Sequence, residues 1–201
     1  MIPVECFVAR SSMRDEWLQA RSMGVTATQV AKAATPAGFK QVIQDLEMHA
    51  EVTPNDVMLW GNLREPYIAQ VVKERFGIMP NDWLISRPGL DSWMMATPDG
   101  LSMDHKVIAE IKTSARSLEK IPIAYMRQMQ WQLWVTGSER CLFAWEQRLD
   151  APNGFAPGFD VSTQWVERDE EMISELVKVA QDVQEYQVNM SLDARLYGVE
   201  E

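Results

Sequence analysis

The chain has 201 residues and a mass of 23.0 kDa, with 46% hydrophobic and 24% charged residues. This is close to the average composition of a soluble globular domain. A chain of this length buries about 70% of the surface of its unfolded state, so it needs neither disulfides nor a structural metal for its core. The composition excludes disordered, collagen-like and disulfide-stapled proteins, and Cys6 and Cys141 have no metal-ligand spacing. We therefore expect a single domain over residues 1–201.

The net charge of −10 argues against a nucleic-acid partner, because phosphate binding depends on Lys and Arg. The acidic residues are concentrated near one end, however. Residues 167–201 hold ten acidic and three basic residues, a net of −7, which leaves −3 for residues 1–166. A local basic surface is compatible with this distribution. No segment approaches the roughly 20 apolar residues that span a bilayer, and no signal-peptide pattern is present, so we expect a cytoplasmic protein without a membrane partner.

Helical patterns dominate residues 12–77. Residues 12–15 (SMRD) and 26–29 (TATQ) have the spacing of capping boxes, which predicts that a helix starts at each. Apolar residues recur at helical spacing in residues 38–51 and again in residues 66–77. These two amphipathic helices need a surface to pack against.

The period then changes from that of helices to that of strands. The predicted strands are residues 82–86, 93–97, 107–112 and 140–146. The turn sequence PDGL lies between the second and third of them and predicts that those two strands form a hairpin. In the third strand, the alternation places Ile108, Glu110 and Lys112 on one face.

The remaining segments complete an α/β pattern. Residues 124–137 have helical length, and the Pro- and Gly-rich residues 150–158 predict a loop. The fold class that follows is a central mixed β-sheet flanked by helices. In this prediction the helical part covers residues 12–77, the sheet core covers residues 82–166, and an acidic surface helix covers about residues 169–189.

Glu110 and Lys112 are charged residues inside an apolar strand, where unpaired ions are costly. The turn before the strand carries Asp99 toward the same end of the sheet. Two carboxylates and an ammonium group suit a hard divalent cation with water-filled positions for a phosphate and a nucleophilic water. Spacing alone leaves a second interpretation equally open, in which Glu110 and Lys112 form an exposed ion pair and Asp99 only forms the turn.

The wider sequence pattern resembles a known family. The motifs TPDG and AEIK resemble the metal-binding signature of the PD-(D/E)xK nuclease superfamily. Further segments occur in an order and spacing similar to those of the phage lambda-type alkaline exonuclease family, the viral recombinase type of that superfamily. They are DEWLQARSMGVTATQV, LWGNLREPYIAQVVKERFG, ATPDGL, EIKT, AYMRQMQWQLWVTG and VERDEEM. The resemblance covers residues 13–185 and implies a restriction-endonuclease-like core.

The resemblance assigns roles at the metal site. Asp99 and Glu110 match the metal-binding carboxylates, the Ile111 carbonyl matches a further metal ligand, and Lys112 matches the catalytic lysine. The implied cofactor is Mg²⁺, for which Mn²⁺ is expected to substitute.

Two more residues match the family's catalytic set. Glu65 matches an acidic helix residue at a second metal position, and Gln128 matches a glutamine that helps to place the attacking water. Pro66 follows Glu65 directly, and proline is tolerated in a first helical turn. We therefore expect the helix to start near Glu65.

Four residues match a pocket that, in the family, holds the 5′-terminal phosphate of the digested strand. They are Arg21, Thr28, Thr97 and Arg116. Arg21 offers a planar fork of donors to a phosphate, and Thr28 lies in the first turn of the helix that starts at Thr26, where free N–H groups attract anions.

The resemblance implies a Mg²⁺-dependent exonuclease that degrades one strand of linear double-stranded DNA from its 5′ end. It would release mononucleotides and leave a 3′ overhang. The implied partners are DNA ends, a single-strand annealing protein and two further copies of the chain in a homotrimeric ring. Two alternatives stay open: an endonuclease of the same superfamily, of restriction or repair type, and a catalytically silent DNA-binding module.

Overall fold

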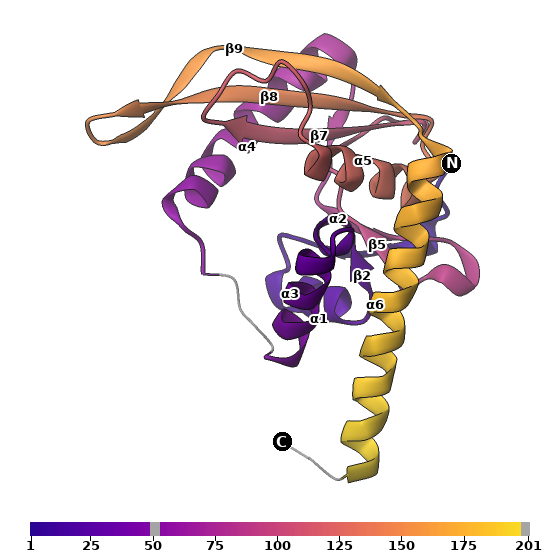
Figure 1. The fold of residues 1–201 in the computed structure, drawn as a ribbon. Coiled ribbons are helices and arrows are strands. Elements are labelled where there is room, and N and C mark those ends of the chain that lie inside the picture. Colours follow the sequence, from indigo (N-terminus) through magenta and orange to yellow (C-terminus); the bar gives the residue numbers. More distant parts are fainter. Residues whose placement is uncertain (49–52, 198–201) are drawn as a thin grey trace.

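The computed structural model describes residues 1–48 and 53–197 (Figure 1). The helices are α1 (Arg14–Ser22), α2 (Ala27–Ala33), α3 (Pro36–Glu47), α4 (Asp56–Phe76), α5 (Ile123–Thr136) and α6 (Glu170–Tyr197). The strands are β1 (Phe7–Arg10), β2 (Val25–Thr26), β3 (Met79–Pro80), β4 (Trp83–Ser86), β5 (Met94–Ala96), β6 (Gly100–Leu101), β7 (Val107–Ser114), β8 (Arg140–Ala151) and β9 (Gly154–Glu167). Short 3-10 turns cover Val4–Cys6 and Gly89–Asp91. The α/β class with mixed sheets flanked by helices is confirmed.

The strands form two sheets where the sequence predicts one. A four-stranded sheet has the order β1-β4-β5-β2, and a five-stranded sheet has the order β3-β6-β7-β8-β9. Both are mixed, because β2 pairs with β5 in parallel and β7 pairs with β8 in parallel. The chain enters the second sheet briefly at β3, returns to the first for β4 and β5, and stays in the second from β6 onward.

The predicted hairpin is wrong in its first strand. β5 pairs with β4 and β2, and the antiparallel neighbour of β7 is the two-residue strand β6. Leu101 pairs with Ile108 and Gly100 with Ala109, so the turn of this hairpin lies after the PDGL sequence. A strand of two residues has no periodicity to detect, which is why the sequence concealed it.

The second half of the chain departs from prediction in two places. The Pro- and Gly-rich residues 150–158 form most of the end of the β8–β9 hairpin, and only the two residues between Ala151 and Gly154 lie outside the strands. Figure 1 shows this hairpin reaching beyond the body of the molecule. The acidic helix α6 is longer than predicted and ends at Tyr197.

The helical first third also contains strands β1 and β2. The capping box at Thr26 is confirmed, since Thr26 and Gln29 exchange side-chain and backbone hydrogen bonds at the start of α2. The capping box predicted at Ser12 is wrong. The first helix begins after Met13 without a side-chain cap, and the Ser12 hydroxyl donates to the Asp82 carboxylate at 3.2 Å.

Two predicted helices change their bounds. The helix predicted over residues 38–51 is α3, which ends at Glu47; residues 49–51 lie outside the described part of the chain. The start expected near Glu65 is wrong, because α4 begins at Asp56, where the Asn55 side chain accepts a hydrogen bond from the Met58 N–H at 3.0 Å. Pro66 therefore lies inside a helix, and its missing N–H leaves one carbonyl of the preceding turn without a helical donor.

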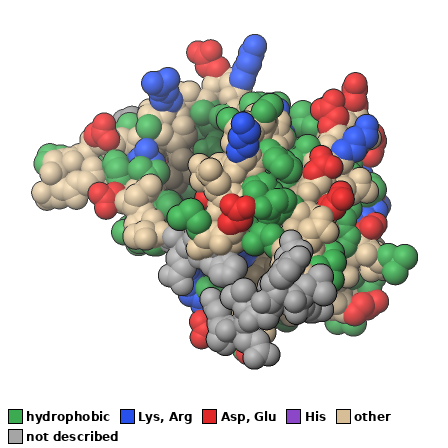
Figure 2. All heavy atoms as spheres, turned by 60° about the horizontal axis from the view of Figure 1, so that its bottom comes forward, with side chains coloured by type: hydrophobic (Ala, Val, Ile, Leu, Met, Phe, Trp, Pro, Cys, Tyr) green, Lys and Arg blue, Asp and Glu red, His purple; other side chains and the backbone are tan. Residues whose placement is uncertain are grey.

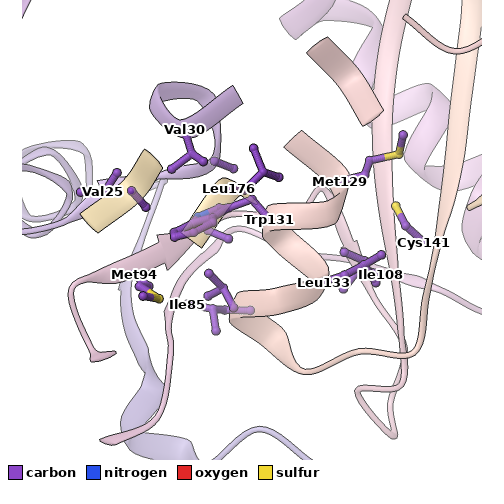
Figure 3. Close-up of a cluster of buried hydrophobic side chains, with 14 of the residues drawn as sticks. Val25, Val30, Ile85, Met94, Ile108, Met129, Trp131, Leu133, Cys141 and Leu176 are labelled. Carbon is purple, nitrogen blue, oxygen red and sulfur yellow. The ribbon is translucent and has the colours of Figure 1, made fainter. Parts of the chain in front are cut away.

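Helix α5 joins the layers of the molecule. Figure 3 shows Trp131 pointing toward Val30 and Leu176, while Met129 points toward Cys141. The Trp131 indole also donates to the Met95 carbonyl at 3.0 Å, which ties α5 to β5. A second apolar cluster lies between α4 and the opposite face of the five-stranded sheet. The alternation predicted for β7 is confirmed: Ala109 belongs to this second cluster, and Ile108 belongs to the cluster around α5.

Among the described helices, none is long and apolar enough to cross a membrane.

Candidate active site

The site begins where β6 and β7 lie side by side. The Asp99 N–H donates to the Ala109 carbonyl at 3.0 Å, and an Asp99 carboxylate oxygen accepts the Ile111 N–H at 2.6 Å. Asp99 is thus fixed at the edge of β7 by its backbone and its side chain. In a strand, the N–H and C=O of one residue point to the same side, so the Ile111 carbonyl also points toward Asp99.

Glu110 and Lys112 meet on the face of β7 that is covered by α5. The Lys112 Nζ contacts Glu110 Oε1, and the Glu110 side chain is only 1% exposed. Lys112 also lies over the ring of Tyr125, with its Nζ 5.6 Å from the ring centroid. The interpretation of Glu110 and Lys112 as an exposed surface pair is therefore wrong, because Glu110 is buried and the Lys112 side chain is only 25% exposed.

Burial and neighbouring charges shift the pKa values of Asp99 and Lys112. Burial, and then the negative charge of Glu110, raise the pKa of Asp99 well above its ordinary value. Burial acts to lower the pKa of Lys112, but the charges of Glu110 and Asp99 outweigh it, and the pKa of Lys112 lies above its ordinary value. Lys112 is therefore a cation at neutral pH.

Glu65 approaches the same group from α4. Burial raises the pKa of its carboxyl group, the charge of Lys112 opposes the rise, and the charge of Glu110 adds to it. Although Pro66 lies within the helix, the structure thus keeps Glu65 within electrostatic reach of Glu110 and Lys112.

Helix α5 adds two glutamines on one face. Gln132 donates from Nε2 to Glu110 Oε2 at 2.7 Å and is fully buried. Gln128 lies one turn earlier on the same face, half-buried, between Tyr125 and Gln132. The sequence prediction named Gln128 and missed Gln132. The signal that was available is the four-residue spacing between the two glutamines.

The donor set fits a magnesium ion. Among the described residues, no group of three or more His, Cys, Asp or Glu side chains is gathered tightly enough to hold a metal by itself. Magnesium does not require such a cage, because it keeps several waters and is usually held by one or two carboxylates. Asp99 and Glu110 would supply these carboxylates and the Ile111 carbonyl a third oxygen, and the repulsion that Glu110 exerts on Asp99 would favour a bound cation.

Two threonines predicted for a phosphate pocket follow the carboxyl ends of neighbouring strands in the four-stranded sheet. β2 and β5 are parallel neighbours, with Thr26 opposite Met95. Thr28 follows β2 in the first turn of α2, and Thr97 follows β5 directly. The Thr97 hydroxyl is buried without a hydrogen-bond partner. The backbone before β2 passes close to the backbone before β5, and this requires a glycine at Gly24, because a Cβ there would lie 2.2 Å from the Trp93 carbonyl oxygen.

The two arginines of the predicted pocket differ in their surroundings. Arg21, at the end of α1, stacks on Trp17 with its Cζ 4.2 Å from the ring centroid, and burial lowers its pKa. Within residues 1–48 and 53–197, the Arg21 guanidinium group makes no ion pair or hydrogen bond, and no carboxylate charge shifts its pKa, so its donors are free for a ligand. Arg116 is exposed after β7, where its backbone N–H donates to the Ser114 hydroxyl at 3.2 Å.

The site and fold agree with a family match. Residues 16–139 match the model of the YqaJ-like viral recombinase domain, and this range contains all the site residues described above. The chain therefore belongs to the YqaJ-like viral recombinase family. No curated protein matches it.

Solved structures support the same conclusion about the fold. The chain is similar to an alkaline exonuclease from Laribacter hongkongensis, with 25% identity, a TM-score of 0.73 and coverage of 92% of this chain and 98% of that chain. A second structure of that enzyme, in complex with dAMP, gives 24% identity, a TM-score of 0.71 and the same coverage. A phage-related exonuclease from Haemophilus somnus 129PT has 15% identity, a TM-score of 0.64 and coverage of 85% and 96%. The restriction-endonuclease-like core predicted from the sequence is confirmed by these neighbours.

Proposed function

We propose that this chain is a Mg²⁺-dependent exonuclease that degrades one strand of linear double-stranded DNA from the 5′ end. One observation carries the proposal: Asp99, the buried Glu110 and the cationic Lys112 converge at the edge of β7. A site of this kind combines oxygen ligands for a divalent cation with a fixed positive charge, which is the combination that phosphodiester hydrolysis requires. Membership of a viral recombinase family supports DNA as the substrate.

In this proposal Asp99, Glu110 and the Ile111 carbonyl hold the cation, and Glu65 serves a second cation position. When bound, Mg²⁺ neutralises the scissile phosphate, activates water and stabilises the leaving 3′-oxygen. Lys112, which contacts the Glu110 carboxylate, orients the attacking water in this proposal. Gln128, on the facing helix α5, hydrogen-bonds to the same water, either as a donor or as an acceptor.

End recognition uses residues beside the four-stranded sheet, together with Arg116 after β7. Arg21 has free donors and a half-buried, stacked guanidinium group, which suits a terminal phosphate. Thr28 and Thr97 add hydroxyl groups from parallel strand ends, and the unpaired Thr97 hydroxyl supports a ligand there. Arg116 is a further phosphate contact from the exposed end of β7. A terminal phosphate held there places the next phosphodiester at Asp99, which gives mononucleotide products and a 3′ overhang; the dAMP complex of the Laribacter hongkongensis enzyme supports such a product.

The assembly remains part of the proposal. We expect three copies to form a ring around DNA and a single-strand annealing protein to receive the 3′ overhang. On the face shown in Figure 2, acidic and basic side chains are mixed with exposed hydrophobic ones, and no continuous basic surface is visible there. A ring lined by a different face is compatible with this distribution. Sedimentation of the purified protein measures the number of copies directly.

The deciding experiment compares linear and covalently closed circular duplexes in Mg²⁺, with a label at either the 5′ or the 3′ end of the linear substrate. We expect the linear duplex to be degraded and the closed circle to survive. The 5′ label should be released first as a mononucleotide, while the 3′-labelled strand shortens only at its far end. Omission of the divalent cation should stop all degradation.

Other outcomes identify the alternatives. Nicked or linearised circles indicate an endonuclease of the PD-(D/E)xK type. Binding of both DNAs without degradation in Mg²⁺ or Mn²⁺ indicates a silent DNA-binding module. Early release of the 3′ label contradicts the proposed direction.

A further inference from the structure

A buried glutamine beside the metal-binding carboxylates has one half of its amide group unpaired. Gln132 lies in the middle of α5 and has no exposed surface. Its Nε2 donates to Glu110 Oε2 at 2.7 Å, while its Oε1 is buried without a partner. A buried amide oxygen without a donor destabilises the fold, and an apolar side chain at this position would avoid that cost.

The hydrogen bond gives Glu110 two different donors. Lys112 contacts Oε1, and Gln132 contacts Oε2, so the carboxylate is held at both oxygens. The opposite amide orientation of Gln132 would bring its oxygen against the Glu110 carboxylate. Glu110 and Gln132 therefore fix each other's orientation. In this orientation Oε1 of Gln132 has no hydrogen-bond donor among the described residues.

Gln130, two residues earlier, shows what a structural glutamine on this helix looks like. It is also buried, but its Nε2 donates to the Glu167 carbonyl at 2.8 Å and its Oε1 accepts the Asp169 N–H at 2.9 Å. Both halves of that amide pair with the backbone between β9 and α6. The Nε2 of Gln132 instead donates to a carboxylate, and its side chain makes no hydrogen bond to the backbone in the described part of the chain. This difference separates its role from that of Gln130.

We propose that Gln132 is a positioning residue, which holds the Glu110 carboxylate in the orientation that a divalent cation requires. This inference rests on the proposed function, because it assumes that Glu110 is a metal ligand. Hydrogen bonds to a ligand from residues behind it commonly change metal affinity or activity by about 10- to 100-fold. Gln132 acts through Glu110 and contacts no reacting atom.

The test compares Gln132→Met with Gln130→Met. Methionine is unbranched and close in length to glutamine, so each variant removes the amide and keeps the buried volume. Mn²⁺ and Mg²⁺ affinities are measured by calorimetry on the metal-free proteins, together with their thermal unfolding and their DNA digestion. We expect Gln132→Met to weaken cation binding by about tenfold or more. Gln130→Met is expected to unfold at a lower temperature with unchanged cation affinity.

Gln132→Asn keeps an amide in the core but is one methylene shorter, so it loses the reach to Glu110. We expect the same loss of cation affinity in this variant, which protects the test if the methionine variant does not fold. The inference is overturned if Gln132→Met or Gln132→Asn binds both cations as the wild type does. If the wild type itself binds no divalent cation or leaves linear DNA intact, the proposed function fails, and this inference fails with it.

Discussion

Two buried glutamates on adjacent parallel strands have very different partners. Glu146 on β8 is 2% exposed and accepts two hydrogen bonds from Arg64, at 2.8 Å and 2.7 Å. Glu110 on β7 is 1% exposed and contacts Lys112. Both carboxylates have a cation from the chain, so burial of charge alone does not distinguish them.

The neighbourhood distinguishes them. The Arg64–Glu146 pair joins α4 to the sheet with one positive and one negative charge and a matched, two-pronged geometry. Around Glu110, one ammonium group serves the carboxylates of Glu110, Asp99 and Glu65. A buried ion pair whose opposite charges balance is suited to a structural role. A buried group with more negative than positive charge is suited to binding a cation that supplies the missing positive charge.

The largest expected effect comes from removing the charges of the β7 site. Asp99→Ala, Glu110→Ala and Lys112→Ala should each reduce the digestion of linear DNA by roughly 10³-fold or more, because each removes an electrostatic group that acts on the transition state. Initial rates with saturating Mg²⁺ measure the loss, and circular dichroism checks that each variant is folded. A folded variant that digests DNA at the wild-type rate would show that the active site is elsewhere.

Breaking the other pair should affect folding. Arg64→Met leaves Glu146 buried without its cation, which should reduce the free energy of unfolding by on the order of 3 kcal/mol. Arg64→Met combined with Glu146→Met removes both charges and should restore most of the loss. Urea denaturation measures both variants. A midpoint for Arg64→Met equal to that of the wild type would remove the contrast between the two glutamates.

The sequence predicted the parts of the site that lie on long, regular elements. The alternation of β7 predicted that Glu110 and Lys112 share a face, while the grouping with Asp99 as a metal site came from the family resemblance, because spacing alone left an exposed ion pair equally open. The hydrogen bond from Gln132 to Glu110 was not predictable, since it depends on how α5 packs over the sheet. The division into two sheets was also missed, because it depends on strands of two residues, such as Val25–Thr26 and Gly100–Leu101, that carry little periodic signal.

The third prediction concerns the proposed phosphate pocket. A charge-assisted contact contributes on the order of 1.5–3 kcal/mol, which corresponds to about tenfold or more in rate. Arg21→Ala should therefore slow the digestion of 5′-phosphorylated duplexes by about tenfold, and it should slow that of 5′-hydroxyl duplexes much less. Single-turnover rates on both ends measure this difference. Equal losses on both ends would make Arg21 a general backbone contact and favour the endonuclease alternative.

A smaller effect is expected in the stability of the metal-free protein. The pKa of Asp99 is raised in the fold, so the folded state binds its proton more tightly than the unfolded state. The stabilisation from this protonation is complete below the ordinary pKa of 3.8 and is lost as pH rises toward the raised value. Asp99→Asn should therefore unfold a few degrees higher than the wild type at pH 7.5 and show little difference at about pH 3.5. Thermal unfolding in EDTA across this range measures the effect, and a lower unfolding temperature for Asp99→Asn at pH 7.5 would contradict it.

The most direct test of the charge excess is thermal unfolding at pH 7.5 with and without Mg²⁺. A cation that binds only the folded state raises its stability according to concentration and affinity. We expect Mg²⁺ to raise the unfolding temperature of the wild type, and of Arg64→Met by a similar amount, but not that of Asp99→Asn or Glu110→Gln. An equal response to Mg²⁺ in the wild type and in both carboxylate variants would show that the acidic group at β7 is not the cation site.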